Sequence, residues 1–354
     1  MSQTLQEMQR IAGATFEPVA QVPVPSSFGN DTAALQAARQ GVALVDLSHW
    51  GLLKISDEDR LRFLHNQSTN DFQNLKPGQG CDTVFVTSTA RTIDLVTAYV
   101  TEEAVLLLVS PNRRQQLLEW LDRYIFPMDR VELADISNET AIFSLVGSDC
   151  DTLLTKLGVQ LPIGEAYPSH QHLTLNDIEV RMARGSGLAL PGYTLIVPAS
   201  DAAKLWQTLT TADAIPMGDR VWQQLRIEQG RPLPDYELTE DYNPLEAGLW
   251  STISFEKGCY IGQETIARLN TYKGVKQQLW GVRLPAPVEP GTVVTVDGEK
   301  VGKLTSCTPT EQGYIGLAYI RTKAGGVGLK VQVGEVEGDV VDVPFLTHEY
   351  PGNQ

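Results

Sequence analysis

The chain has 354 residues, of which 42% are hydrophobic and 20% charged, a composition typical of globular proteins with two or three domains. Its formal net charge of -15 argues against non-specific binding to nucleic acid or to an anionic membrane, because both are themselves densely negative. No apolar run reaches the roughly 18 residues that span a bilayer, and the first residues lack the apolar core of a signal peptide. We therefore expect a cytoplasmic protein.

The first half of the chain mixes helical and strand patterns. In chain order these predict a helix over 34–40, a strand around Asp46, a helix over 57–69, strands at 83–88, 94–100 and 104–110, and a helix over 110–126. Gly41 ends the first helix, while Ser110 and Pro111 fit the N-cap and first position of the last one. This order of elements is typical of an α+β module.

The second half begins in the same way and then changes character. The patterns predict a strand at 141–147, a hairpin over 172–184, a strand at 193–198, and helices over 200–212 and 218–230. From about Val275 onward the chain consists of short strand patterns with almost no helical period, including a hairpin turn at Asp297–Gly298. This last quarter predicts a small β-barrel or sandwich.

One of the four cysteines stands in an unusual setting. Cys259 lies in the sequence KGCYIGQE (residues 257–264), directly before a predicted helix. A helix N-terminus and the neighbouring Lys257 would both stabilise the thiolate form of Cys259. The alternative is that Cys259 is packed in the interior as a small hydrophobe, which is the commoner fate of a free cysteine.

A second group of polar residues follows the predicted helix over 218–230. Arg226 is suited to a ligand carboxylate, since its planar guanidinium makes two parallel hydrogen bonds. Glu228 is two residues away, so on a helix the two side chains lie on different faces. A surface salt bridge explains the same pattern equally well.

Acidic side chains at strand ends and turns form a third group, in which Asp46, Asp71 and Asp94 could each accept a hydrogen bond from a ligand amidine or act as a general base. Capping acids have the same sequence pattern. The five histidines and the scattered cysteines show no metal-ligand spacing, so no metal site is predicted, and the histidines are interpreted as structural or solvated.

Taken together, these motifs resemble a known family. KGCYIGQE resembles the signature of the YgfZ family, folate-binding proteins related to the aminomethyltransferase (T-protein) of the glycine cleavage system. The segments GVALVDLSHWGLLKI, LRFLHNQSTNDFQNLKPGQG and LRIEQGRPLPDYELTEDYNPLEAGL resemble T-protein segments, and VGKLTSCTPTEQGYIGLAYI resembles the closing barrel. The TARTID run is similar to the cyanobacterial and chloroplast branch.

The resemblance implies an α+β fold: a three-domain cloverleaf with a ferredoxin-like module, a C-terminal β-barrel and a central folate-binding channel. The domains expected from it are, first, 1–50 with 135–160 and 215–274; second, a ferredoxin-like domain of 51–134 with 161–214; and third, a barrel of 275–354. The implied function is that of a tetrahydrofolate-binding accessory protein in the biogenesis or repair of iron-sulfur enzymes.

The residues expected to carry this function follow from the motifs and the resemblance together. As reactive residues we expect Cys259, Lys257 and Asp94; as folate-binding residues we expect Asp71, Arg226, Glu228, Tyr193, Trp250, Tyr260 and Gln263. The ligand would be tetrahydrofolate or a one-carbon-substituted folate. The expected partners are iron-sulfur proteins or their assembly factors, with no nucleic acid and no membrane, and the chain is expected to be a monomer.

Two other functions remain open. The first is a true aminomethyltransferase or another folate-dependent one-carbon transferase. Against it, Thr194 stands where T-proteins carry a glutamate, and Asp94 is a single aspartate where they carry two. The second is a non-catalytic scaffold that has kept the fold without the ligand, with the acidic surface serving partner recognition.

Overall fold

The computed structural model describes residues 3–164 and 167–349. It divides into two compact units. The first unit comprises residues 1–63, 73–82 and 96–223, and the second comprises 64–72, 83–95 and 224–354. No helix within the described ranges is both long enough and apolar enough to cross a membrane.

The first unit contains a six-stranded sheet in the order β10-β11-β12-β9-β3-β13. Its strands are β3 (Ala43–Asp46), β9 (Thr140–Val146), β10 (His170–Leu175), β11 (Ile178–Arg184), β12 (Gly192–Pro198) and β13 (Ile215–Met217). Around it lie α1 (Leu5–Ile11), α2 (Asp31–Gln40), α5 (Cys150–Lys156), η2 (Ala199–Asp201) and α6 (Ala202–Thr211), with a hairpin of β1 (Thr15–Val19) and β2 (Val22–Ser27). Leucines of α5 and α6 pack with the sheet in one apolar core, because each helix turns one apolar face inward.

A second sheet has the order β5-β6-β7-β4-β8. Its strands are β4 (Gly51–Ser56), β5 (Gly80–Val86), β6 (Thr92–Val100), β7 (Ala104–Val109) and β8 (Glu132–Asp135), and its helices are α3 (Arg60–Gln67), η1 (Pro111–Arg113) and α4 (Arg114–Asp122). The chain passes from one unit into the other within β5 and within β6. All nine residues of β6 are buried, including the polar side chains of Thr92, Asp94 and Thr97.

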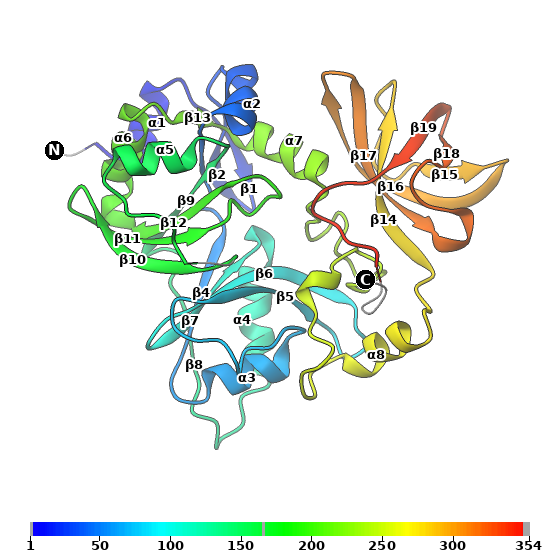
Figure 1. The fold of residues 1–354 in the computed structure, drawn as a ribbon, viewed down its shortest axis with the longest axis horizontal. Coiled ribbons are helices and arrows are strands. Elements are labelled where there is room, and N and C mark those ends of the chain that lie inside the picture. The colour runs from blue at the N-terminus through cyan, green and yellow to red at the C-terminus, as the bar shows by residue number, and fades with distance from the viewer. Residues whose placement is uncertain (1–2, 165–166, 350–354) are drawn as a thin grey trace. The chain divides into compact units, whose positions relative to one another are not determined.

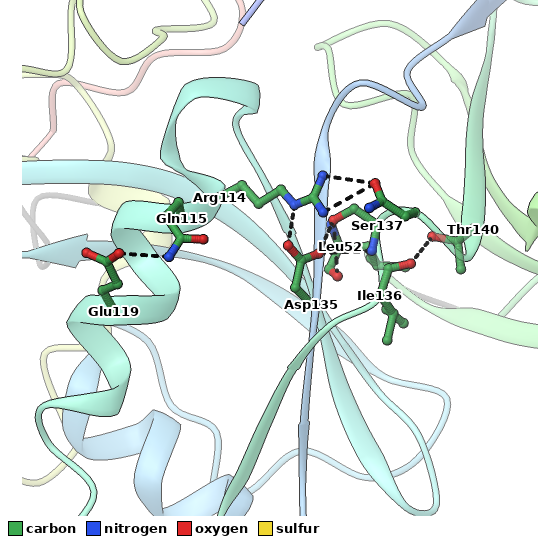
Figure 2. A network of polar contacts seen from close by, with 9 residues as sticks. Leu52, Arg114, Gln115, Glu119, Asp135, Ile136, Ser137 and Thr140 are labelled. Carbon is green, nitrogen blue, oxygen red and sulfur yellow. Dashed lines mark hydrogen bonds and ion pairs between the residues drawn. The ribbon is translucent and has the colours of Figure 1, made fainter. Parts of the chain in front are cut away.

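The edge of this sheet is held by a polar network (Figure 2). Arg114 of α4 donates through Nε to Asp135 of β8. The hydroxyl of Ser137 donates to the other carboxylate oxygen of Asp135 at 2.6 Å and accepts a hydrogen bond from the amide of Leu52 in β4 at 2.8 Å. One carboxylate therefore connects the helix, the edge strand and the neighbouring strand.

The second unit ends in a closed barrel in the order β14-β17-β16-β15-β18-β19 (Figure 1). The strands are β14 (Gln277–Leu284), β15 (Val293–Val296), β16 (Glu299–Thr310), β17 (Gly313–Arg321), β18 (Lys330–Val333) and β19 (Val336–Val341). Before and within it lie α7 (Asp219–Gln229), η3 (Trp250–Thr252), α8 (Gln263–Thr271) and η4 (Thr322–Ala324). The expected α+β fold with a C-terminal barrel is confirmed.

The pairing of β12 shows which sheet residues 161–214 join. They were expected in a ferredoxin-like domain with 51–134; β12 pairs antiparallel with β9 from Gly192–Val146 to Pro198–Thr140. Strands β10 to β12 therefore belong to the six-stranded sheet with β3. Local patterns predict that a strand exists, whereas its partner is chosen by long-range packing.

The Asp135 network predicts an acid-dependent contribution to stability. Burial by itself raises the pKa of Asp135, but the hydrogen bonds from Ser137 and Arg114 outweigh it and leave this pKa below its usual value. A carboxyl group of this kind stabilises the fold above its unfolded pKa of about 3.9, and the contribution is lost as the pH falls through the lower folded pKa. We expect Asp135→Asn to lower the free energy of unfolding by about 1–2 kcal/mol at pH 7, with a smaller difference below about pH 4.

Urea denaturation of the wild type and of Asp135→Asn, at pH 7 and below about pH 4, measures this difference. The matched control is Asp213→Asn, because Asp213 forms an ion pair with Lys156 that is 86% and 62% exposed at the two side chains and should contribute less than about 0.5 kcal/mol. Equal effects of the two substitutions would contradict the assignment.

Candidate functional site

The loop that carries Cys259 is attached to the turn after α3, within the second unit. The amide of Ser254 donates to the carbonyl of Thr69 at 3.0 Å, and the hydroxyl of Thr69 donates back to the carbonyl of Thr252 at 2.8 Å. Further along, the amide of Ile261 donates to the carbonyl of Asn66 at 3.2 Å. These bonds hold both ends of the loop against residues 66–69.

Lys257 forms the centre of this attachment. Its side chain is buried, and its ammonium group donates to the carbonyl of Ser68 at 2.7 Å, to that of Asn70 at 2.8 Å, and to that of His65. The last carbonyls of a helix lack intrahelical partners and carry partial negative charge, so an ammonium group is a suitable cap for α3. Lys257 was expected to act beside the thiol; the structure directs its charge to these carbonyls, which gives it an anchoring role.

The loop then exposes Cys259 and leads into α8. The Cys259 side chain is exposed, whereas Cys81 and Cys150 are buried, so packing of Cys259 as a small hydrophobe is ruled out. The helix begins at Gln263, as expected, after Gly262 at φ 81°. A Cβ at Gly262 would lie 2.9 Å from the carbonyl oxygen of Thr87. Only glycine combines this φ with so close an approach.

A histidine and an aspartate lie beside this loop. His65 is 5% exposed, and its Nδ1 lies 3.1 Å from Oδ1 of Asp71. A Cβ placed on Gly258 would stand 3.7 Å from Nε2 of His65, so the imidazole borders the residue before Cys259. Burial lowers the pKa of His65, as does the charge of Lys257, while Asp71 opposes both. Sequence reasoning had placed Asp71 in the site but not His65, because their separation of six residues across the end of a helix matches no motif.

The aromatic residues predicted for the site form part of a small apolar cluster. Trp250 and Tyr260 are buried together with Ala90 and Ile266. The ammonium group of Lys257 lies 4.7 Å from the centre of the Tyr260 ring, a cation-π geometry. The side chain of Gln263 reaches back to the carbonyl of Gly258 at 3.4 Å. One segment, whose position is fixed by side chains, thus contains five of the predicted residues: Trp250, Lys257, Cys259, Tyr260 and Gln263.

Arg226 has an internal role. It is 2% exposed, and its Nη1 lies 2.9 Å from Oε2 of Glu237, which is 0% exposed. Its Nη2 donates to Ser306 at 3.1 Å, and Ser306 donates to Glu237 at 2.5 Å. Arg226, expected to contact a ligand carboxylate, thus forms a buried ion pair with Glu237 and a hydrogen bond to Ser306 that joins α7 to the barrel strand β16.

The remaining predicted residues are distributed as follows. Glu228 accepts a hydrogen bond from Gln224 at 2.8 Å on the same helix, on a different face from Arg226 as expected. Asp94 in β6 is fully buried. Tyr193 lies in the core of the first unit, where its hydroxyl donates to Asp151 at 2.6 Å. Because Tyr193 is committed to that core, we do not include it in the site.

A separate hollow of about 780 Å³ lies on the barrel surface. It is lined by residues of β14, β15, β18 and β19 with their turns, among them Arg283, Asp297, Lys330 and Glu337. None of the residues predicted for the site lines it. At the Cys259 loop an exposed thiol, a buried imidazole and a carboxylate lie on adjoining segments.

Comparison with known proteins finds similar sequences over most of the chain. Residues 5–257 match the family model described as the GCVT N-terminal domain. The chain is 48% identical over 331 residues to a protein of Arabidopsis thaliana described as a putative chloroplastic transferase, covering 93% of this chain and 77% of that one. It is 29% identical over 337 residues to an aminomethyltransferase of Geobacillus kaustophilus, covering 91% and 92% of the two chains.

Among solved structures, the aminomethyltransferase T of the glycine cleavage system from Bartonella henselae aligns with a TM-score of 0.86. The alignment covers 98% of both chains at 21% sequence identity. Identity this low supports a shared fold and no more.

The buried ion pair predicts a large loss of stability when one partner is removed. Glu237→Ala leaves the Arg226 guanidinium buried without its carboxylate, so we expect the free energy of unfolding to fall by about 3–5 kcal/mol. Urea denaturation measures the loss. The control Glu17→Ala removes an ion pair to Arg220 that is about 60% exposed on both sides and should cost less than about 1 kcal/mol. A loss at Glu237 no larger than the control would contradict the buried role.

The anchoring role of Lys257 predicts a local effect on the loop. Lys257→Met keeps the side-chain length and removes the three hydrogen bonds, so residues 254–261 should open more readily. We expect faster amide hydrogen exchange at Ser254 and Ile261, by about 10-fold or more. Lys300→Met, at an exposed position in the barrel, is the control. Unchanged exchange in the Lys257 variant would show that other contacts hold the loop.

Proposed function

This chain belongs to the family that carries the GCVT N-terminal domain, and we propose that it binds tetrahydrofolate, or a one-carbon-substituted folate, with Cys259 as its working thiol. The proposed role is an accessory one in the biogenesis or repair of iron-sulfur enzymes. The observation that carries the proposal is the presentation of Cys259: its side chain is exposed while the loop on both sides is hydrogen-bonded to the turn after α3.

The chemistry of a reduced folate supports this choice. Its pterin is flat and has an amidine edge, so a suitable site combines apolar aromatic surface with a carboxylate or backbone acceptor. The Trp250–Tyr260 cluster and the carboxylate of Asp71, whose side chain is 26% exposed, supply these groups. Asp94 is fully buried, so Asp71 is the better placed of the two carboxylates. A thiol beside the ligand suits the handling of a one-carbon unit, because sulfur in its thiolate form is a strong nucleophile.

The second candidate is an aminomethyltransferase or another one-carbon transferase. Several relatives, including that of Geobacillus kaustophilus, are named aminomethyltransferases, which favours it. Against it stands Thr194, which is buried and donates its hydroxyl to the carbonyl of Gly185 at 2.9 Å. A threonine bonded in this way supplies no carboxylate to a ligand. Formation of methylenetetrahydrofolate from an aminomethyl-loaded carrier protein would select this candidate.

The proposal predicts that Cys259 is needed for the function of the protein but not for the binding of folate. Titration of the protein with tetrahydrofolate under reducing conditions, followed by tryptophan fluorescence, should give a micromolar dissociation constant. Cys259→Ala should change it by less than about threefold, because the thiol acts after binding. In a strain lacking the protein, the wild type should restore iron-sulfur enzyme activity and Cys259→Ala should not.

Two results would contradict the proposal. Absence of wild-type binding at near-millimolar folate would favour a scaffold that kept the fold without the ligand. Full restoration of iron-sulfur enzyme activity by Cys259→Ala would exclude the thiol from the function. Arg226→Ala is unsuitable as a binding variant, since the buried ion pair makes loss of stability its expected effect.

A further inference from the structure

The surroundings of Cys259 include a base. We propose that the imidazole of His65 takes the proton of the Cys259 thiol, with Asp71 holding the ring in the required tautomer. The inference rests on the proposed function only in taking Cys259 as the working thiol. It adds a catalytic residue, His65, and a positioning residue, Asp71.

The first step of the argument is the orientation of His65. With Nδ1 at 3.1 Å from the Asp71 carboxylate, the hydrogen of a neutral imidazole resides on Nδ1, because a carboxylate accepts hydrogen bonds and does not donate them. Nε2 then carries the lone pair. The side chain is 6% exposed, and the bond between Nδ1 and Asp71 leaves Nε2 for a second partner. A buried imidazole is thus left with one nitrogen available as a base.

The second step is the place to which Nε2 points. It lies 3.7 Å from the position of a Cβ on Gly258, the residue directly before Cys259. The loop cannot drift from this place easily, because Lys257 is bonded to the carbonyls of Ser68 and Asn70 and Ile261 to that of Asn66. The segment that presents the thiol and the helix end that presents the imidazole are therefore one assembly.

The third step is electrostatic. The charged groups that face His65 are Asp71 and Lys257, and burial together with Lys257 lowers the pKa of His65. The ring is therefore neutral near pH 7 and free to accept a proton. Burial disfavours an isolated imidazolium, but a thiolate formed in the same step compensates its charge, and Asp71 stabilises it from the other side.

The chemical step balances without an external oxidant or reductant. The Sγ–H bond of Cys259 breaks as the Nε2–H bond of His65 forms, giving a thiolate and an imidazolium. The thiolate then attacks an electrophilic carbon, the class to which a folate-borne one-carbon unit belongs, and the leaving group departs with its electron pair. The proton on Nε2 passes to that leaving group or to solvent. A base oriented by a third group activates a nucleophile in this way, and the contact that the structure shows is that of the base with its orienting carboxylate, Asp71.

Alkylation by iodoacetamide tests the inference without any folate. The reagent forms an S–C bond at Cys259 and releases iodide. All proteins carry Cys307→Ser, because Cys307 is half-buried, and mass spectrometry of the Cys259 peptide gives the rate from pH 5 to 10. We expect His65→Gln to slow alkylation at pH 7 by about 10-fold or more and to move the pH-rate profile to higher pH. Asp71→Asn should act in the same direction more weakly.

The control is His172→Gln, since His172 is an exposed histidine that also faces a carboxylate, Glu179, at 3.4 Å. It should leave the profile unchanged. If folded His65→Gln reacts at the wild-type rate with the wild-type profile, the inference is overturned. A second measurement avoids this variant: in nuclear magnetic resonance, the pH titration of His65 should change between wild type and Cys259→Ser, and identical titrations would also overturn it.

These outcomes are separate from those of the folate experiment. A wild-type protein that fails to bind tetrahydrofolate, yet loses Cys259 reactivity with His65→Gln, would refute the proposed ligand and support the thiol-imidazole pair. The converse result would leave a folate site whose thiol is activated by other groups.

Discussion

The geometry of the Cys259 loop depends on one cation. An ammonium group that leaves water must recover its hydrogen bonds, and Lys257 does so with three backbone carbonyls at and beyond the end of α3. Those carbonyls in turn have no partner within the helix, so each side satisfies the other. Because the lysine and the carbonyls are almost 190 residues apart in sequence, this interaction brings the KGCYIGQE segment to the segment that carries His65 and Asp71.

Arg226 is the second buried cation of this unit, and it holds a helix against a barrel strand. Arg226, Glu237 and Ser306 form a closed set of hydrogen bonds, to which Thr305 adds a bond to Glu237 at 2.8 Å. Removing a single member would leave a buried charge uncompensated, which is costly, although the intact pair need not be more stable than an apolar replacement. In this chain the set of hydrogen bonds fixes the position of α7 relative to the barrel strand β16.

The charged groups at the surface differ in burial from those beside Cys259. The net charge of -15 is spread over solvated side chains, where individual ion pairs contribute little. Beside Cys259, in contrast, Lys257 is buried and bonded to three carbonyls, and the buried His65 lies against Asp71. An exposed thiol in such a setting differs from the buried Cys150, whose pKa burial raises to about 12 and which is correspondingly inert.

Much of the local structure could be predicted from the sequence, because it depends on neighbours along the chain. The start of α8 after Gly262, the barrel strands after Val275 and the divergence of Arg226 from Glu228 on α7 all follow from periodicity and turn chemistry. The motif around Cys259 also marked the loop that leads into α8. The pairing of β12 with β9 did not follow, since strand patterns carry no information about distant partners.

The partners of the ionisable side chains, like those of the strands, could not be predicted from the sequence. The sequence by itself determined that Lys257 lies in the KGCYIGQE motif and that Arg226 precedes an acidic loop. Only the tertiary structure decided that one caps α3, that the other is buried against Glu237, and that His65 borders Gly258. The physical reason is that the free energy of a charged group is set by burial and by the groups within a few ångströms of it, and those groups come from segments far apart in the chain.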